Sequence, residues 1–231
     1  VRLVEAYVFR RAICAIPTNS LNKTFANLGR TIDKKRYLSS VQANFQSMKS
    51  YRRFPHDEEF MQELKNRDLY NFPRRSYWLR RFENFGRKER VHVDDYTIEH
   101  ILPQDPNLSD EWRDELGDEP EQVQERWLHT LGNLTLTGYN SEYSNRPFRE
   151  KRDMKDGFRH SPLRVNEGLG TTETWNAEAI QARASRLAQE AARVWCAPQL
   201  SADELAEFDV AQSAPSTGYT IEDHQHLASG H

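Results

Sequence analysis

The stretch YTIEHILPQ, residues 96–104, sets a carboxylate beside an imidazole in an apolar run. The two side chains belong to Glu99 and His100, and Pro103 follows three residues later. The β-branched, partly alternating pattern of residues 91–103 predicts a strand that ends near this proline. Because an apolar environment penalises an ionised group unless it is paired or bound to a metal, this pair indicates a functional site.

A second strand is predicted over residues 132–140, GNLTLTGYN, where Leu and Thr alternate between Gly and Asn residues. We expect residues 133–137 to pair antiparallel with residues 96–101. A helix is predicted over residues 146–158, with Pro147 near its first turn. The order is therefore strand, strand, helix, with polar side chains at the junctions.

The side chains at these junctions suit hydrolysis of a phosphodiester. The reaction needs a water deprotonated near neutral pH, and histidine titrates in that range. It also needs a divalent metal to neutralise charge that develops on the phosphate and the leaving oxygen. A hard cation takes oxygen ligands, which Glu99 and the amide carbonyl of an asparagine would supply. Because consecutive strand residues point to opposite faces, Glu99 and His100 can share one site at a strand end or bulge.

Three segments resemble a known nuclease family. EHILPQ, residues 99–104, resembles the DHIxPQ segment of HNH nucleases, with Glu in place of Asp. LGNLTLTGYNSEYSNRPFREK, residues 131–151, resembles the C-terminal HNH domain of GmrSD-type modification-dependent (Type IV) restriction endonucleases. VRLVEAYVFRRAICAIPTNSLNKTF, residues 1–25, resembles the helical segment that precedes this domain. The resemblance covers roughly residues 1–196.

The resemblance implies a metal-dependent DNA endonuclease with a ββα-metal (HNH) core. It implies Mg²⁺, or Mn²⁺ in its place, and a phage-defence system whose substrate is modified phage DNA. Examples of such DNA carry glucosylated hydroxymethylcytosine or phosphorothioate. The resemblance also implies a nucleotide-hydrolysing ParB-like domain earlier in the full-length chain, and a chain that begins with Val1 is expected to be part of a longer protein. The alternative is a catalytically inactive DNA-binding or protein-interaction module with a degenerate HNH core.

The resemblance also implies roles for single residues. His100 matches the general base, and Glu99 matches the metal-binding acid, whose longer arm favours coordination through a water. Asn133 matches the asparagine that braces the loop carrying the base. Asn140 is the favoured final metal ligand, and Asn145 is the alternative ligand or else a helix cap. The presence of His100, Asn133 and Asn140 together argues against a decayed site.

Charge is distributed unevenly along the chain. Residues 1–90 carry 20 Lys and Arg against 9 Asp and Glu, whereas residues 91–231 carry 12 against 26. The N-terminal part is therefore suited to a polyanion. Residues 146–164 form a basic island, whose candidates for contact with DNA phosphates are Arg146, Arg149, Lys151 and Arg152. The alternative for these residues is a solvated helix face, and His129 is predicted either to contact a phosphate or to lie at the surface.

The whole pattern predicts an α+β protein that is mainly α. Helical periodicity makes residues 1–90 a basic helical segment, which is expected to pack as a layer on the core. Residues 91–165 form the predicted HNH core, and residues 166–196 contribute a C-terminal amphipathic helix that packs on it. Residues 197–231 are predicted to be an acidic linker and the start of a truncated element, YTIEDHQHL.

The two cysteines, Cys14 and Cys196, lie in apolar, helix-like stretches and are expected to be buried free thiols of a cytoplasmic protein. Neither has a CxxC partner, so no structural zinc is expected and residues 105–128 must be held by packing alone. No apolar run approaches the ~18 residues of a membrane span, and no signal-peptide pattern opens the sequence.

Overall fold

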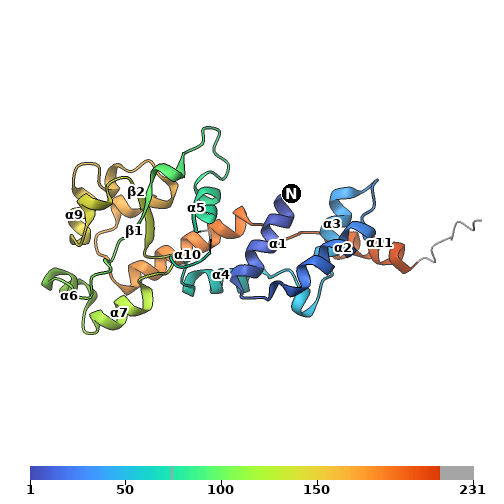
Figure 1. Ribbon diagram of the computed structural model, residues 1–231, viewed down its shortest axis with the longest axis horizontal. Coiled ribbons are helices and arrows are strands. Elements are labelled where there is room, and N and C mark those ends of the chain that lie inside the picture. Colours follow the sequence, from blue (N-terminus) through green and yellow to red (C-terminus); the bar gives the residue numbers. More distant parts are fainter. Residues whose placement is uncertain (74, 214–231) are drawn as a thin grey trace, which may run out of the picture.

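The computed structural model describes residues 1–73 and 75–213, and this part of the chain is mainly helical with one two-stranded sheet (Figure 1). The predicted class, α+β and mainly α, is confirmed. The helices are α1 Arg2–Ile13, α2 Leu21–Thr31, α3 Tyr37–Gln46, α4 Asp57–Asn66, α5 Arg75–Glu83, α6 Asp110–Leu116, α7 Pro120–Trp127, α8 Asn140–Tyr143, α9 Phe148–Asp153, α10 Ala177–Val194 and α11 Ala202–Ser213. The strands are β1 Thr97–His100 and β2 Leu134–Thr137. Short 3₁₀ helices lie at Thr18–Ser20, Ser50–Arg52, Val93–Asp95, Phe158–His160, Arg164–Asn166 and Leu169–Thr171.

The two strands pair antiparallel, as the sequence predicted. Glu99 lies opposite Thr135 in the register, and β1 ends at His100. One further backbone bond follows the strand, because the Ile101 N–H donates to the Asn133 carbonyl at 3.0 Å. All four residues of β2 are buried, so the sheet is covered by other elements. Glu99 and His100 therefore lie at the end of an enclosed strand pair.

The first hydrophobic cluster joins the N-terminal helices to the sheet. It contains large side chains such as Tyr7, Phe45 and Trp78 together with Leu134 and Leu136 of β2. Burial of each such side chain stabilises the fold by about 1.5–3 kcal/mol. The predicted basic helical segment therefore shares a core with the second strand. The division of the chain into four segments stays a prediction.

The second hydrophobic cluster includes the residues that directly follow β1. Its buried members are Ile101, Leu102, Leu108, Trp112, Leu116, Tyr143, Phe148, Phe158, Leu169, Trp175 and Ile180. Helix α10 belongs to both clusters, because Ile180 lies in the second and Leu187 in the first. In Figure 1 the sheet, α6, α7 and α9 lie at one end of an elongated molecule, α2, α3 and α11 lie at the other, and α10 runs from the sheet toward α1 near the middle.

Gly132 and Arg183 fix α10 against the start of β2. A Cβ at Gly132 would lie 2.3 Å from the backbone oxygen of Ile180, so a larger residue cannot take its place without displacing the helix. The Arg183 guanidinium is buried and donates to backbone carbonyls at 2.6 to 3.2 Å. These carbonyls belong to Leu131, Gly132, Leu134 and Val165. Burial lowers the pKa of Arg183 to about 9.

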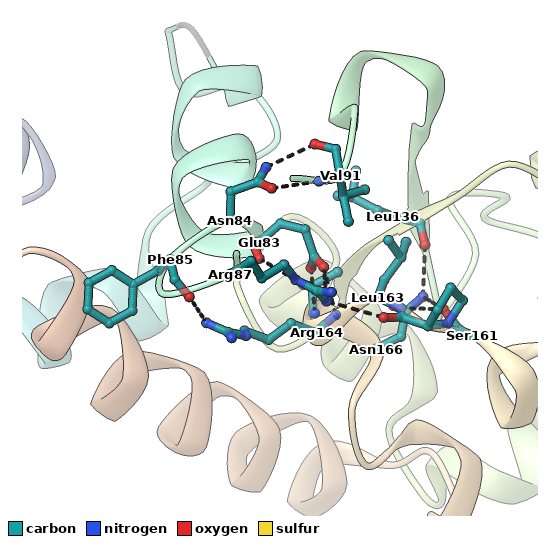
Figure 2. A network of polar contacts seen from close by, with 12 residues as sticks. Glu83, Asn84, Phe85, Arg87, Val91, Leu136, Ser161, Leu163, Arg164 and Asn166 are labelled. Carbon is teal, nitrogen blue, oxygen red and sulfur yellow. Dashed lines mark hydrogen bonds and ion pairs between the residues drawn. The ribbon is translucent and has the colours of Figure 1, made fainter. Parts of the chain in front are cut away.

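A buried carboxylate joins α5 to the segment that covers the sheet (Figure 2). The Glu83 side chain is fully buried and accepts hydrogen bonds from the backbone N–H groups of Arg164 and Val165, at 2.9 and 3.0 Å. In the same network Asn166 Nδ2 donates to the Leu136 carbonyl of β2 at 2.9 Å. The network therefore sets the position of α5 relative to the sheet.

The predicted acidic linker contains a helix, α11. Ser201 and Glu204 form a capping box at its start, because the Ser201 N–H donates to Glu204 Oε2 at 2.8 Å and the Glu204 N–H donates to Ser201 Oγ at 3.3 Å. The linker prediction is therefore corrected for residues 202–213. The predicted truncated element, residues 219–227, lies outside the described residues.

Both cysteines are free thiols, but the prediction that both are buried is wrong. Cys14 is half-buried, and burial raises its pKa to about 12. Cys196 is exposed because it lies just past Val194, the last residue of α10. In residues 1–73 and 75–213, no helix combines the length and the apolar character that a bilayer crossing requires.

Candidate functional site

A small cleft opens at the end of β1. Its volume is about 180 Å³, and its lining residues are Tyr70, Ile98, Glu99, His100, Pro103, Gln104, Asn140, Ser144 and Asn145. Four predicted site residues therefore meet in one cleft. Glu99 and His100 are each 4% exposed, whereas Asn140 and Asn145 lie at its exposed rim. The strand end allows the two consecutive residues of β1 to reach the same space.

The Glu99 carboxylate is paired with the ammonium group of Lys151 on α9. Lys151 Nζ lies 2.6 Å from Glu99 Oε1 and donates to the carbonyls of His100 and Ile101, both at 3.1 Å. The three donors of the ammonium are therefore all used inside the protein. Burial raises the pKa of Glu99 and lowers that of Lys151, and the ion pair opposes both shifts.

His100 packs against a second imidazole and a tyrosine. His100 Nε2 lies 3.0 Å from His129 Nδ1, and within the described part of the chain no residue bonds to His100 Nδ1. The Tyr70 ring stands edge-on to His100, with centroids 4.5 Å apart, and stacks on His129 at 5.1 Å. Burial, together with the nearby His129 and the ammonium of Lys151, lowers the pKa of His100 to about 3. His129, predicted to contact a phosphate or lie at the surface, is half-buried and contacts the His100 ring.

Asn133 lies fully buried just before β2 and makes a complete set of hydrogen bonds. Its Oδ1 accepts from the Leu102 N–H at 2.7 Å and from Trp175 Nε1 at 3.1 Å. Its Nδ2 donates to the carbonyls of Leu102 and Leu128, both at 3.0 Å. All four hydrogen-bonding positions of the amide are used. Asn133 thus ties the loop after His100 to the end of α7, which fits the predicted bracing role.

The two asparagines at the rim differ in their contacts. Asn140 is the first residue of α8, and Asn145 lies between α8 and α9. Asn145 Nδ2 donates to Asp105 Oδ2 at 2.8 Å. The prediction that Asn145 caps the next helix is wrong, because the residue before α9 is Pro147 and no side chain caps this helix. Between the asparagines, Ser144 has φ of +43°, a left-handed conformation that is uncommon for serine.

The four basic candidates fall into two pairs. Arg146 and Arg149 are exposed, as a contact with DNA requires. Lys151 and Arg152 are buried, which contradicts the prediction that they reach DNA phosphates. The reason is helical spacing, because Phe148 is also buried and lies three and four residues before them, on the same face of α9.

The donor set at the cleft fits an open Mg²⁺ site. Among the described residues, none donates a hydrogen bond to Glu99 Oε2, so this oxygen is left for a cation. Asn140 and Asn145 would add amide oxygens, and Mg²⁺ usually keeps several waters and is completed by substrate phosphates. Within the described ranges, no three His, Cys, Asp or Glu side chains gather as a closed metal site.

Sequence reasoning missed three contacts of this site. The helical spacing of Lys151 from Phe148 was a signal that the lysine faces inward. His129 was found as a candidate, but its partner is His100. No local pattern pointed to Tyr70, because its contact with His100 depends on how the segment between α4 and α5 packs on the sheet.

Comparison with known proteins gives one family. The model of the GmrSD restriction endonucleases, C-terminal domain, matches residues 54–190. This range contains the cleft, both strands and most of α10. No curated protein and no solved structure matches the chain.

Proposed function

The chain belongs to the family of GmrSD restriction endonuclease C-terminal domains, and from that premise we propose that it is a metal-dependent endonuclease that hydrolyses DNA phosphodiester bonds. The observation that carries the proposal is the cleft at the end of β1, which gathers Glu99, His100 and Asn140. A base, a carboxylate and an amide oxygen around one space are the groups that this hydrolysis needs.

His100 is assigned as the general base that takes a proton from the attacking water. Because His129 occupies Nε2, the proton would be accepted at Nδ1. A pKa of about 3 keeps the ring neutral, which is the form that accepts a proton. An anionic phosphate in the cleft would raise this pKa, because a nearby negative charge favours the protonated ring. The strength of the base would therefore rise when substrate is bound.

Glu99 and the rim asparagines would hold the divalent cation, Mg²⁺ or Mn²⁺. When bound, the cation supplies positive charge against the phosphate and the leaving oxygen. Lys151 holds Glu99 through Oε1, so that Oε2 is left for the cation. The family resemblance makes Asn140 the preferred amide ligand, and Asn145 also keeps its Oδ1 for the cation because it is bonded to Asp105 through Nδ2.

The family resemblance supplies the biological setting of the proposal. The setting is a phage-defence restriction system that acts on modified DNA in the cytoplasm. A nucleotide-hydrolysing ParB-like domain of the full-length protein is the proposed partner. The surplus of Lys and Arg in residues 1–90 supports DNA as the ligand, because a basic surface attracts a polyanion.

The Glu99–Lys151 pair favours a second candidate function, an inactive module that binds DNA or another protein. A carboxylate that already faces an ammonium 2.6 Å away attracts a cation less strongly than a free carboxylate does. The two candidates differ in one property, which is metal-dependent cleavage.

A plasmid-nicking assay tests the nuclease proposal. With Mg²⁺ or Mn²⁺, the wild-type chain is expected to convert supercoiled plasmid into nicked or linear DNA. His100→Ala is expected to lower the rate by about 10²–10⁴-fold or more while DNA binding is kept. His160→Ala, an exposed histidine that does not line the cleft, is the matched control and should cleave normally. Binding without cleavage by the wild type would favour the inactive module, and full cleavage by His100→Ala would overturn the assigned base.

A further inference from the structure

A second hollow adjoins the cleft on the side of α5. Its volume is about 390 Å³, and its lining includes Leu79, Val93, Ile98 and Leu136 as apolar residues, with Tyr70, Tyr96, Arg75, Ser76, Asp94, Thr97 and Asn140 around them. Tyr70, Ile98 and Asn140 line both the hollow and the cleft. The two spaces therefore share a wall.

Tyr96 lines this hollow and packs partly against the first hydrophobic cluster. Its side chain is half-buried, and no ring or cation of the described residues packs against its ring. Tyr70 differs, because its ring stacks on His129 and also packs against Arg75. The guanidinium carbon of Arg75 lies 4.5 Å from the centroid of the Tyr70 ring. Of these two tyrosines, Tyr96 is therefore the one whose ring has no aromatic or cationic partner among the described residues.

Arg75 gives the hollow a cationic rim. Its side chain is exposed, and it forms no ion pair within the described part of the chain. Arg75 NH1 donates to the Tyr70 carbonyl at 2.9 Å, which holds the guanidinium at this position. The carboxylate of Asp94 also lines the hollow, but it lies 3.8 Å from the guanidinium of Arg80, which offsets its charge.

We propose that this hollow binds the unstacked nucleobase of a DNA nucleotide adjacent to the phosphodiester held in the cleft, an inference that rests on the proposed function. An apolar floor beside a tyrosine ring that has no aromatic or cationic partner suits a flat aromatic base, and such stacking accepts any base. Arg75 contacts the neighbouring phosphate and so contributes to affinity without reading sequence. The volume lies within the range of sites that enclose small ligands.

Binding to two matched probes tests the hollow. One probe is a short single-stranded oligothymidylate, and the other is an abasic tetrahydrofuran oligomer of the same length, which has the same backbone charge but no bases. Affinities are measured by fluorescence anisotropy in the full chain carrying His100→Ala, so that no cleavage occurs. Tyr96→Leu is expected to weaken binding of the oligothymidylate by about 10-fold and to leave the abasic oligomer unchanged. Tyr96→Phe should bind both probes as the His100→Ala background does.

Further variants separate base contacts from other effects. Arg75→Gln should weaken both probes equally, because a phosphate contact does not depend on the base. Tyr37→Leu, an exposed tyrosine that lines neither space, should change neither affinity. Ser76→Arg narrows the hollow from its exposed rim, so it tests the loss of base binding even if Tyr96→Leu fails to fold; Ser76→Trp is the second variant of this kind.

The outcomes distinguish the hollow from the nuclease activity. Equal weakening of both probes by Tyr96→Leu and by Ser76→Trp, or the absence of any preference for the oligothymidylate, overturns the base site. The expected pattern combined with a wild-type chain that cleaves no plasmid would refute the nuclease proposal and retain the base site.

Discussion

Lys151 Nζ lies 2.6 Å from Glu99 Oε1, so the lysine assigned from the sequence to DNA and the carboxylate assigned to the metal form one buried ion pair. The pair joins α9 to the C-terminal end of β1, because the same ammonium donates to the carbonyls of His100, the last residue of β1, and of Ile101, the residue after it. Loss of the lysine therefore affects the stability of the protein and the position of the carboxylate together.

Lys151→Met is expected to lower the free energy of unfolding by about 3–5 kcal/mol, because it leaves the Glu99 carboxylate buried without a partner. Burial already raises the pKa of Glu99 above its ordinary value, and loss of the ammonium raises it further. A group with a raised pKa contributes stability that is present at low pH and is lost as the pH rises. The destabilisation by Lys151→Met should therefore be larger at about pH 8 than at about pH 5 in urea unfolding.

The matched control for this prediction is Lys155→Met, which removes an exposed lysine next to α9. It should change the free energy of unfolding by less than about 0.5 kcal/mol. The double variant Glu99→Gln with Lys151→Met should recover part of the lost stability, because no charge is then left unpaired. A double variant that is destabilised by the full sum of the two single changes would contradict the pairing.

Asn133→Ala is expected to cost more than about 2 kcal/mol in the free energy of unfolding. The change leaves the buried donors of Leu102 and Trp175 without acceptors, and each such group costs about 1–3 kcal/mol. Cleavage of plasmid should fall as well, because the loop after His100 loses its brace. Asn22→Ala, at an exposed position of α2, is the control. Equal melting temperature and full cleavage for Asn133→Ala would remove the bracing role.

His100 should make the stability of the protein depend on pH below neutrality. Its pKa is about 3 in the fold, against about 6.5 for an unfolded histidine. Between these values the unfolded state binds the extra proton, so stability falls as the pH drops from about 6.5 toward 3, by at most about 1.4 kcal/mol per pH unit. Urea unfolding of wild type and His100→Gln at stepped pH isolates this contribution. A difference between the two proteins that stays constant with pH would show that His100 titrates alike in both states.

Arg149→Glu is expected to weaken DNA binding and to flatten its dependence on salt. Each phosphate contact contributes a slope of about 0.9 in a plot of log affinity against log salt concentration, so one contact should be visible. Arg149 is exposed and suits such a contact, whereas Arg152 is buried and bonded to the Thr172 carbonyl at 2.7 Å. Arg152→Gln should therefore lower stability and leave the salt slope unchanged. An unchanged slope for Arg149→Glu would show that this arginine faces solvent only.

The sheet and the position of the cleft could be predicted because their signals are local. Alternating Leu and Thr before a Gly-Tyr-Asn turn predict β2, and Pro103 marks the region where β1 stops. The resemblance to HNH nucleases added the roles of His100 and Asn133. In the structure His100 lines the cleft and Asn133 bonds the loop behind it, and both roles stay predictions.

The other features of the fold and the site could not be predicted, because they depend on which face of a helix turns inward and on contacts between segments that are distant in the sequence. The basic residues of α9 were counted along the chain, and that count does not separate the outward Arg149 from the inward Lys151. Helix α11 was missed because its apolar pattern is weak, although its Ser201–Glu204 capping box was visible in the sequence. Tyr70 reaches His100 only through tertiary packing, which no local pattern encodes.

Helix α10 contributes Ile180 to one hydrophobic cluster and Leu187 to the other, so the number of residues between them decides whether both side chains can be buried at once. Each residue of an α-helix turns the chain by about 100° and advances it by about 1.5 Å. One residue inserted between Ile180 and Leu187 would therefore rotate Leu187 out of its cluster, although it would add no charge and remove no contact by itself. The spacing within α10 therefore sets how the part of the molecule that contains the cleft is oriented relative to the N-terminal helices.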